Sequence, residues 1–322
     1  MNNKRMVAAA IAIAVAWSPE ALAQAYPAKA IRIISPFPPG GSVDIVARIV
    51  ANELAKPMGQ QVVVDNRSGA SGNIGTELAK NSAPDGYTLL LNTLPLVTNQ
   101  FLYSRVPYDP INDFAPVSLI SSSPSVITVH PSLPVRSVRE LIALAKARPG
   151  KLNYGSAGAA TNPHIAGELF NYLSKANLVA VHFKGGGPAL VATMSGETEA
   201  TFANITESAP LVLAKRLRAL AVTGSQPARI LPGVPTVASA GLPDYEFTTW
   251  HAVVAPKATP PAVIAVLSDK IRTTLRTPEQ TQRFADRGLD LIASTPDELS
   301  AHLKSEIQKW GRVIRERGMK AE

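Results

Sequence analysis

The stretch Ser35–Arg48, SPFPPGGSVDIVAR, follows the apolar run Ile31–Ile34 and leads into what reads as a helix. Its prolines fix the backbone, whereas Gly40 and Gly41 leave it free to turn and to approach other groups closely. Apolar side chains then recur at helical spacing over Val43–Lys56. The stretch therefore predicts a strand, a loop that is first rigid and then permissive, and a helix.

The same order of strand, small-residue loop and helix recurs along the chain. Further strands are expected over 61–64, 87–91, 126–129, 151–154, 179–183 and 217–222, and further helices over 73–81 and 137–147, from Pro163 and from Pro188. Thr277 and Thr295 each precede a proline and stand three residues before Gln or Glu, which predicts two capped C-terminal helices. Apolar strands alternating with helices favour a parallel sheet covered on both faces.

The first residues have the layout of a secretory signal peptide, not of a membrane anchor. Lys4 and Arg5 precede an apolar run that ends at Trp17, which is shorter than the ~20 residues that a membrane span needs. Small residues then offer cleavage after Ala23 or after Ala25. We expect residues 1–23 to be removed and the mature protein to be exported.

Composition narrows the classes of function. There are no cysteines, which excludes disulfides, thiolate metal sites and a cysteine nucleophile. The net charge is +8, but the basic residues are scattered and only 6% of the chain is aromatic. Such a pattern argues against nucleic-acid binding and fits a diffuse positive field that attracts small anions.

Four expected helices begin directly after glycine-rich or small-residue loops. These loops lie at Gly40–Ser42, Ser71–Asn73, Ser156–Asn162 and Gly185–Pro188, with Ser42 and Asn162 as candidate N-caps. Unpaired N–H groups at a helix start suit an anion, and ligands of open α/β sheets bind at the carboxyl ends of strands. Several such starts around one crevice could hold a carboxylate without arginine. The alternative is that each loop is simply a tight turn with a good cap.

Enzyme signatures are absent from the sequence. There is no phosphate-binding loop, no dinucleotide fingerprint and no metalloprotease motif, and Gly155–Gly158 has the wrong spacing for a nucleophile elbow. The five histidines never fall at metal-ligand spacing, so no metal or other cofactor is expected. His164 could contact a ligand or pack at its helix start, and Asp44 could contact a ligand or serve the helix dipole.

The order of several motifs resembles the Bug-type extracytoplasmic solute receptors, the substrate-binding components of tripartite tricarboxylate transporters. The matching segments span nearly all of the expected mature chain: Tyr26-Pro27, Pro36–Asp44 with Ala47-Arg48, Val62–Arg67 with Gly69, Pro84–Tyr87, Pro107–Pro110 with Asp113-Phe114, Tyr154–Ser156, Lys184-Gly185, Leu217–Thr223 and Pro232–Thr236. One departure is Phe183, where the family often has tyrosine, so a hydrogen bond from that hydroxyl cannot be carried over.

The resemblance implies a type II periplasmic-binding-protein fold: two α/β domains with a ligand cleft between them and two crossovers. The implied division is a first domain over 24–124 and 249–322 and a second over 125–248, with hinges near Ser123–Ser125 and Thr248–Trp250. Two loops would hold a ligand carboxylate, largely through main-chain amides and waters. The implied ligand-binding residues are Phe37, Pro39, Gly40, Gly41 and Asp44 in the first loop, Ser156, Ala157, Gly158, Thr161 and His164 in the second, and Asn92, Thr93 and Asn204 beside them.

The resemblance also implies a function without catalysis. A monomeric periplasmic receptor would close on a small carboxylate and deliver it to a membrane transporter of the tripartite tricarboxylate type. Two alternatives remain open from the sequence. One is a sensor or orphan receptor on the same fold, and the other is an enzyme on a binding-protein scaffold, for which the sequence offers no nucleophile–base pair or metal cluster.

Overall fold

The computed structural model describes residues 26–320. The expected signal peptide and both of its cleavage sites lie outside the described residues. The strands are β1 (Ile31–Ser35), β2 (Val62–Asn66), β3 (Thr88–Asn92), β4 (Phe114–Val129), β5 (Asn153–Ser156), β6 (Val179–His182), β7 (Ala200–Asn204), β8 (Arg218–Val222), β9 (Thr248–Pro256) and β10 (Asp290–Leu291). The helices are α2 (Ser42–Met58), α3 (Asn73–Lys80), α4 (Pro95–Leu102), α5 (Val138–Ala147), α6 (Asn162–Ser174), α7 (Gly186–Ser195), α8 (Ile205–Leu213), α9 (Pro261–Leu275), α10 (Pro278–Ala285) and α11 (Pro296–Arg317), with a short 3-10 turn at Ala70–Gly72.

The strands form one mixed sheet in the order β2-β1-β3-β9-β4-β7-β5-β6, with β8 and β10 also paired to β4. The parallel pairs β1–β2, β1–β3 and β5–β6 join predicted strands. β5 also pairs in parallel with β7, a strand that was not predicted. The alternation of strands and helices favoured a parallel sheet, but the sheet is mixed, because β9 runs antiparallel to β3 and to β4, and β4 runs antiparallel to β7 and β8.

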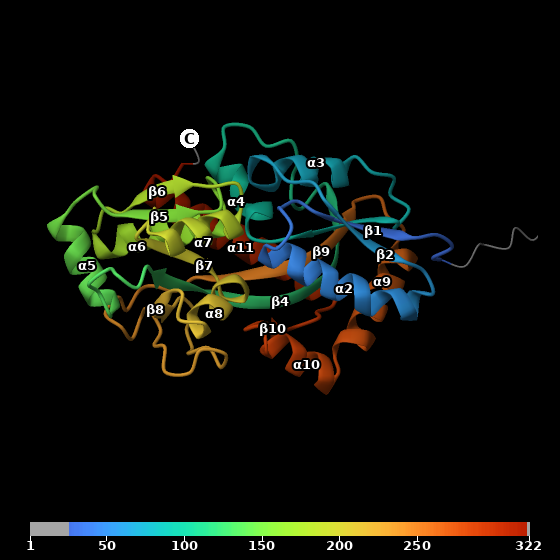
Figure 1. Ribbon diagram of the computed structural model, residues 1–322. Helices are drawn as coiled ribbons and strands as arrows, with labels where there is room; N and C mark the ends of the chain where they lie inside the picture. Colours follow the sequence, from blue (N-terminus) through green and yellow to red (C-terminus); the bar gives the residue numbers. More distant parts are fainter. Residues whose placement is uncertain (1–25, 321–322) are drawn as a thin grey trace, which may run out of the picture.

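The long strand β4 joins the two ends of this sheet (Figure 1). Its first part, up to Pro124, pairs with β9, and its last part, from Ser125, pairs with β7 and β8. We call residues 26–124 with 249–320 the first half, and residues 125–248 the second half. We call β4 and β9 the crossing strands; each pairs antiparallel with its neighbours. Serines and prolines interrupt the apolar pattern of β4. That is why periodicity predicts only its last four residues.

The helices pack against the sheet through two large apolar clusters and two smaller ones in the described residues. In the first half, Ile31, Ile33, Val46, Val50 and Leu54 are buried between β1 and α2 together with apolar residues of α9. A larger apolar cluster runs through the second half and reaches β3, β9 and α11. Burial of this apolar surface is the main favourable term in folding. Among residues 26–320, none of the helices is both long enough and apolar enough to cross a membrane.

Candidate functional site

The loop between β1 and α2 is held from beneath by Asp44. Its carboxylate accepts hydrogen bonds from the main-chain N–H of Gly40 (3.0 Å), from Asn66 Nδ2 (2.9 Å) and from Arg48 Nε (2.9 Å). Asn66 Nδ2 also donates to the Phe37 carbonyl (3.1 Å). Burial alone would raise the pKa of Asp44, but the hydrogen bonds from Arg48, Gly40 and Asn66 hold it below its usual value.

Asp44→Ala is therefore expected to lower the free energy of unfolding by about 2 kcal/mol at neutral pH, because charge-assisted hydrogen bonds contribute on the order of 1.5–3 kcal/mol. The native pKa is depressed, so this contribution is present above the usual carboxyl range and disappears as the pH falls through the native pKa. Urea unfolding at pH 7 and pH 3 measures both effects. Asp269→Ala, on an exposed face of α9, is the matched control and should change little; equal losses in the two variants would contradict this role.

The second loop, between β5 and α6, is organised by its own hydroxyl groups. Ser156 Oγ and Thr161 Oγ1 both donate to the Gly158 carbonyl, at 2.9 and 2.6 Å. His164 Nδ1 accepts the main-chain N–H of Ala160 at 3.0 Å, and the His164 ring lies edge-on to His182. Burial, followed by the neighbouring His182, lowers the pKa of His164 to about 4. His164 is thus a neutral acceptor that fixes the loop.

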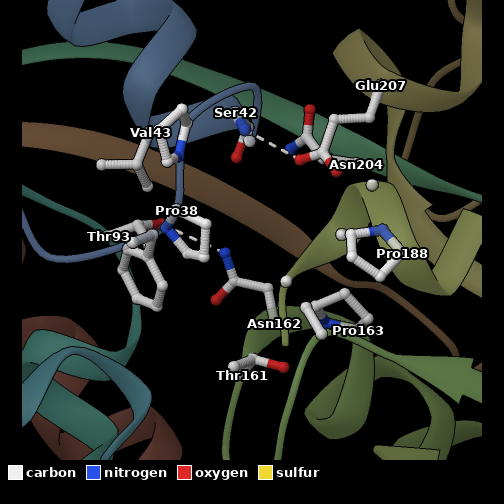
Figure 2. Close-up of a pocket in the computed structure, with 17 residues that line it drawn as sticks. Pro38, Ser42, Val43, Thr93, Thr161, Asn162, Pro163, Pro188, Asn204 and Glu207 are labelled. Carbon is white, nitrogen blue, oxygen red and sulfur yellow. Dashed lines mark hydrogen bonds between the residues drawn. The ribbon is translucent and has the colours of Figure 1, made fainter. Parts of the chain in front are cut away.

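These two loops enclose a cavity together with the starts of α7 and α8. Of the sequence-predicted site residues, those that line it are Phe37, Pro39, Gly41, Thr93, Ala157, Thr161 and Asn204. The others lie behind or beside it: Gly40, Asp44, Asn92, Ser156, Gly158 and His164. Asn92 supports the wall, since its side chain bonds to Thr76 Oγ1 and accepts the N–H of Thr93. Figure 2 shows Ser42 and Val43 on one side of this cavity, with Pro163 and Pro188 facing them.

The cavity wall carries main-chain N–H groups without partners. Within residues 26–320, no hydrogen bond is made by the N–H of Val43 in α2, of Asn162 in α6, or of Gly186 and Gly187 in α7. All of these residues line the cavity and stand in the first turns of their helices. Helix starts combine free donors with the positive end of the helix dipole. The arrangement can hold the oxygens of a small anion.

The expected side-chain caps are not formed. Ser42 and Asn162 are the first residues of their helices, and the positions before them, Gly41 and Thr161, make no side-chain capping bond. Ser42 instead donates its main-chain N–H to Glu207 Oε1 at 2.8 Å. Asn162 Nδ2 donates to Thr93 Oγ1 at 3.2 Å and to Thr249 Oγ1 at 2.7 Å. Both residues thereby connect the two halves across the cavity.

Several cavity residues were missed as ligand contacts by sequence reasoning: Pro38, Ser42, Val43, Asn162, Pro163, Gly185, Gly186, Gly187, Pro188 and Glu207. The glycine loop before Pro188 is one of the four helix starts that the sequence analysis gives as suited to an anion. The sequence therefore indicates this loop, although its residues were not named as ligand contacts. Glu207 has no such signal. An acidic residue in the first turn of a helix is common, and only the tertiary structure turns this one across the cavity.

A second cavity adjoins the first. It shares Phe37, Pro38, Ala157, Thr161 and Gly185 with the first cavity and is also lined by Gly158, Ser71, Tyr103, Phe183 and Lys184. Ser71 Oγ bonds there to the Ala159 carbonyl, which is another contact between the halves. In the described part of the chain, no group of three or more His, Asp or Glu side chains could hold a metal ion.

Comparison with known proteins identifies close relatives. Residues 46–319 match the family model described as the tripartite tricarboxylate transporter family receptor. The chain is 39% identical over 300 residues to the protein BugT of Bordetella pertussis, covering 92% of each chain. A solved structure of an R. palustris protein with adipate has a TM-score of 0.89 and 34% identity, covering 92% of this chain and 99% of that one. MatC from Rhodopseudomonas palustris with bound malate has a TM-score of 0.85 and 28% identity, covering 90% of this chain and 100% of that one.

Proposed function

Because the chain belongs to the tripartite tricarboxylate transporter receptor family, whose members are periplasmic solute-binding proteins, we propose that it captures a small carboxylate in the cavity between its two halves. The observation that carries this proposal is the ring of unpartnered N–H groups at Val43, Asn162, Gly186 and Gly187. A carboxylate held there accepts hydrogen bonds from donors that have no acceptor among the described residues, of which Val43 and Asn162 belong to buried residues. The relatives solved with adipate and with malate agree with this class of ligand.

Capture proceeds by closure of two domains, over 24–124 with 249–322 and over 125–248. Support for hinges near Ser123–Ser125 and Thr248–Trp250 is the register of β4 and β9, in which Ser123 lies opposite Thr249 and Pro124 opposite Thr248. These are the segments that continue from one half into the other. A ligand that contacts both halves binds the closed form better and so shifts the equilibrium toward it.

The proposed function also includes a membrane protein as partner. The closed, loaded receptor is delivered as a monomer to a membrane transporter of the tripartite tricarboxylate type, and no bond of the ligand is made or broken. Export through an N-terminal signal peptide places the protein in the periplasm, where such receptors operate.

A thermal-shift screen tests the ligand class. Mono-, di- and tricarboxylates, amino acids and aromatic acids are compared with their carboxamides on the protein without residues 1–23. We expect at least one carboxylate to raise the melting temperature in proportion to its occupancy, since a ligand at 100 times its Kd stabilises by about 2.7 kcal/mol. The carboxamide of that ligand should have little effect. A melting temperature raised only by carboxylate-free compounds would overturn the proposal.

A further inference from the structure

Glu207 is the one ionisable side chain among the described residues that line the first cavity. It stands in the first turn of α8, three residues after Asn204, whose own side chain caps that helix by accepting the N–H of Thr206 at 3.0 Å. Glu207 is thus not needed as the N-cap. Its Oε1 reaches across the cavity to the Ser42 N–H at 2.8 Å. A carboxylate therefore already occupies part of a wall suited to anions.

The second oxygen of Glu207 has no hydrogen-bond donor in the described part of the chain, although it lies close to Gly186. A Cβ built on Gly186 would stand 1.9 Å from Glu207 Oε2, so the glycine leaves the room that this oxygen fills. A further acceptor nearby also lacks a donor: Oδ1 of Asn162, a residue that is 8% exposed and lines the same cavity. Asn162 Oδ1 is itself buried, so the acceptor that the wall offers a ligand is Glu207, beside the free donors at the helix starts.

The charges around the first cavity also favour a cationic group in the ligand. No lysine, arginine or histidine is among the described residues that line the first cavity, so the Glu207 carboxylate has no cationic partner there. A ligand that carries only carboxylates brings a like charge toward Glu207 in a partly desolvated space. A ligand that also carries an ammonium group supplies the missing cation and the missing donor together.

We propose that Glu207 makes the receptor selective for carboxylates that also bear a protonated amine, with the carboxylate at the helix starts of α2 and α7 and the ammonium at Glu207. This inference rests on the proposed function, because it divides one cavity into an anion-binding and a cation-binding part. The proposed function assigns the carboxylate of the ligand, and this inference adds its ammonium group.

Matched sets of ligands test the selectivity. Aspartate, malate and succinate share one carbon skeleton and differ in an ammonium, a hydroxyl or a hydrogen, and 2-aminoadipate and adipate form a longer pair. Burial raises the pKa of Glu207 to about 7 against the lowering effect of the Ser42 N–H, so titrations are made at pH 8, where the side chain is charged. One of the two sets will bind the protein more tightly than the other. Isothermal titration calorimetry then gives the Kd of every ligand in that set.

At pH 8 we expect the amine-bearing member to bind at least about tenfold more tightly than its partners, which corresponds to about 1.4 kcal/mol. Glu207→Gln keeps the shape and the acceptor for Ser42 but removes the charge, so the preference should fall below about threefold. Glu197→Gln makes the same chemical change at an exposed site outside the cavity and should leave the preference intact. If Glu207→Gln fails to fold, the wild-type protein at pH 5, where Glu207 is protonated, should show the same loss of preference.

The outcomes separate this inference from the proposed function. Equal affinities within each set, a preference for the ligand without the amine, or a preference that survives Glu207→Gln would overturn the selectivity while carboxylate binding stands. Failure of both sets, while another carboxylate raises the melting temperature, would also overturn the selectivity alone. Absence of binding by every carboxylate would overturn the proposed function itself.

Discussion

Gly41→Val is expected to weaken carboxylate binding on the order of 100-fold while the protein stays folded. A Cβ built on Gly41 meets only the Pro38 carbonyl oxygen at 3.5 Å and Glu207 Oε1 at 3.9 Å, and the backbone at Gly41 is extended. The fold can therefore accept a side chain here. Because Pro38, Gly41 and Glu207 all line the first cavity, the added methyl groups take up the space of the ligand. Calorimetry with the tightest carboxylate from the screen measures the loss.

Gly41→Ala provides the matched control, because it adds one carbon at the same position. We expect a smaller loss of affinity than for valine, and melting temperatures of both variants close to that of the wild-type protein. An affinity of the Gly41→Val variant within about threefold of wild type would contradict the placement of the ligand against this loop. If the valine variant unfolds, the affinity of the Gly41→Ala variant decides instead: a loss supports the placement of the ligand against this loop, and an unchanged affinity contradicts it.

Glu306→Ala is expected to lower the free energy of unfolding by about 3 kcal/mol. Glu306 is 9% exposed and its Oε2 accepts hydrogen bonds from the indole N–H groups of Trp250 (2.9 Å) and Trp310 (3.1 Å). Truncation leaves two buried donors without an acceptor, and each such group costs roughly 1–3 kcal/mol. Since Trp250 lies in β9 and Trp310 in α11, the substitution loosens the C-terminal helix from a crossing strand.

Urea unfolding followed by tryptophan fluorescence and by circular dichroism measures this loss. Glu306→Gln retains an acceptor and should lose clearly less stability than the alanine variant. Glu316→Ala, at an exposed position of the same helix, should change the free energy of unfolding by no more than about 0.5 kcal/mol. An effect of Glu306→Ala as small as that of Glu316→Ala would show that the indole N–H groups find other acceptors.

Most strand–helix units could be predicted from sequence because each is encoded locally, although β7 and α8 were not predicted. Ile31–Ile34, the prolines and glycines after it and the apolar period of α2 lie within one short segment, and the structure has these elements with ends shifted by one or two residues. The threonine-capped helices α10 and α11 also begin where expected, and Thr295 and Glu298 form a complete capping box. The crossing strands have no such local pattern, so their antiparallel pairing was not predicted.

The residues of the candidate site also fall into two groups: those that the local sequence indicates and those that depend on distant contacts. The loops that contain Gly41, Ala157 and Thr161 could be found because small residues at helix starts are visible in the sequence, and the resemblance implied these residues as ligand contacts. Asp44 and His164 stand in those same loops, yet their side chains turn away to hold main-chain N–H groups. Glu207 and Asn162 depend on contacts with residues far away in the chain, such as Ser42 and Thr249. Such contacts leave no mark on the local sequence.

The position of the ligand carboxylate in a crystal structure of the liganded protein tests the function of the first cavity most directly. Its oxygens are expected within hydrogen-bonding distance of main-chain N–H groups at Val43, Gly186 or Gly187, between the starts of α2 and α7. A carboxylate bound instead in the second cavity, beside Ser71 and Lys184, would contradict the assignment of the binding site.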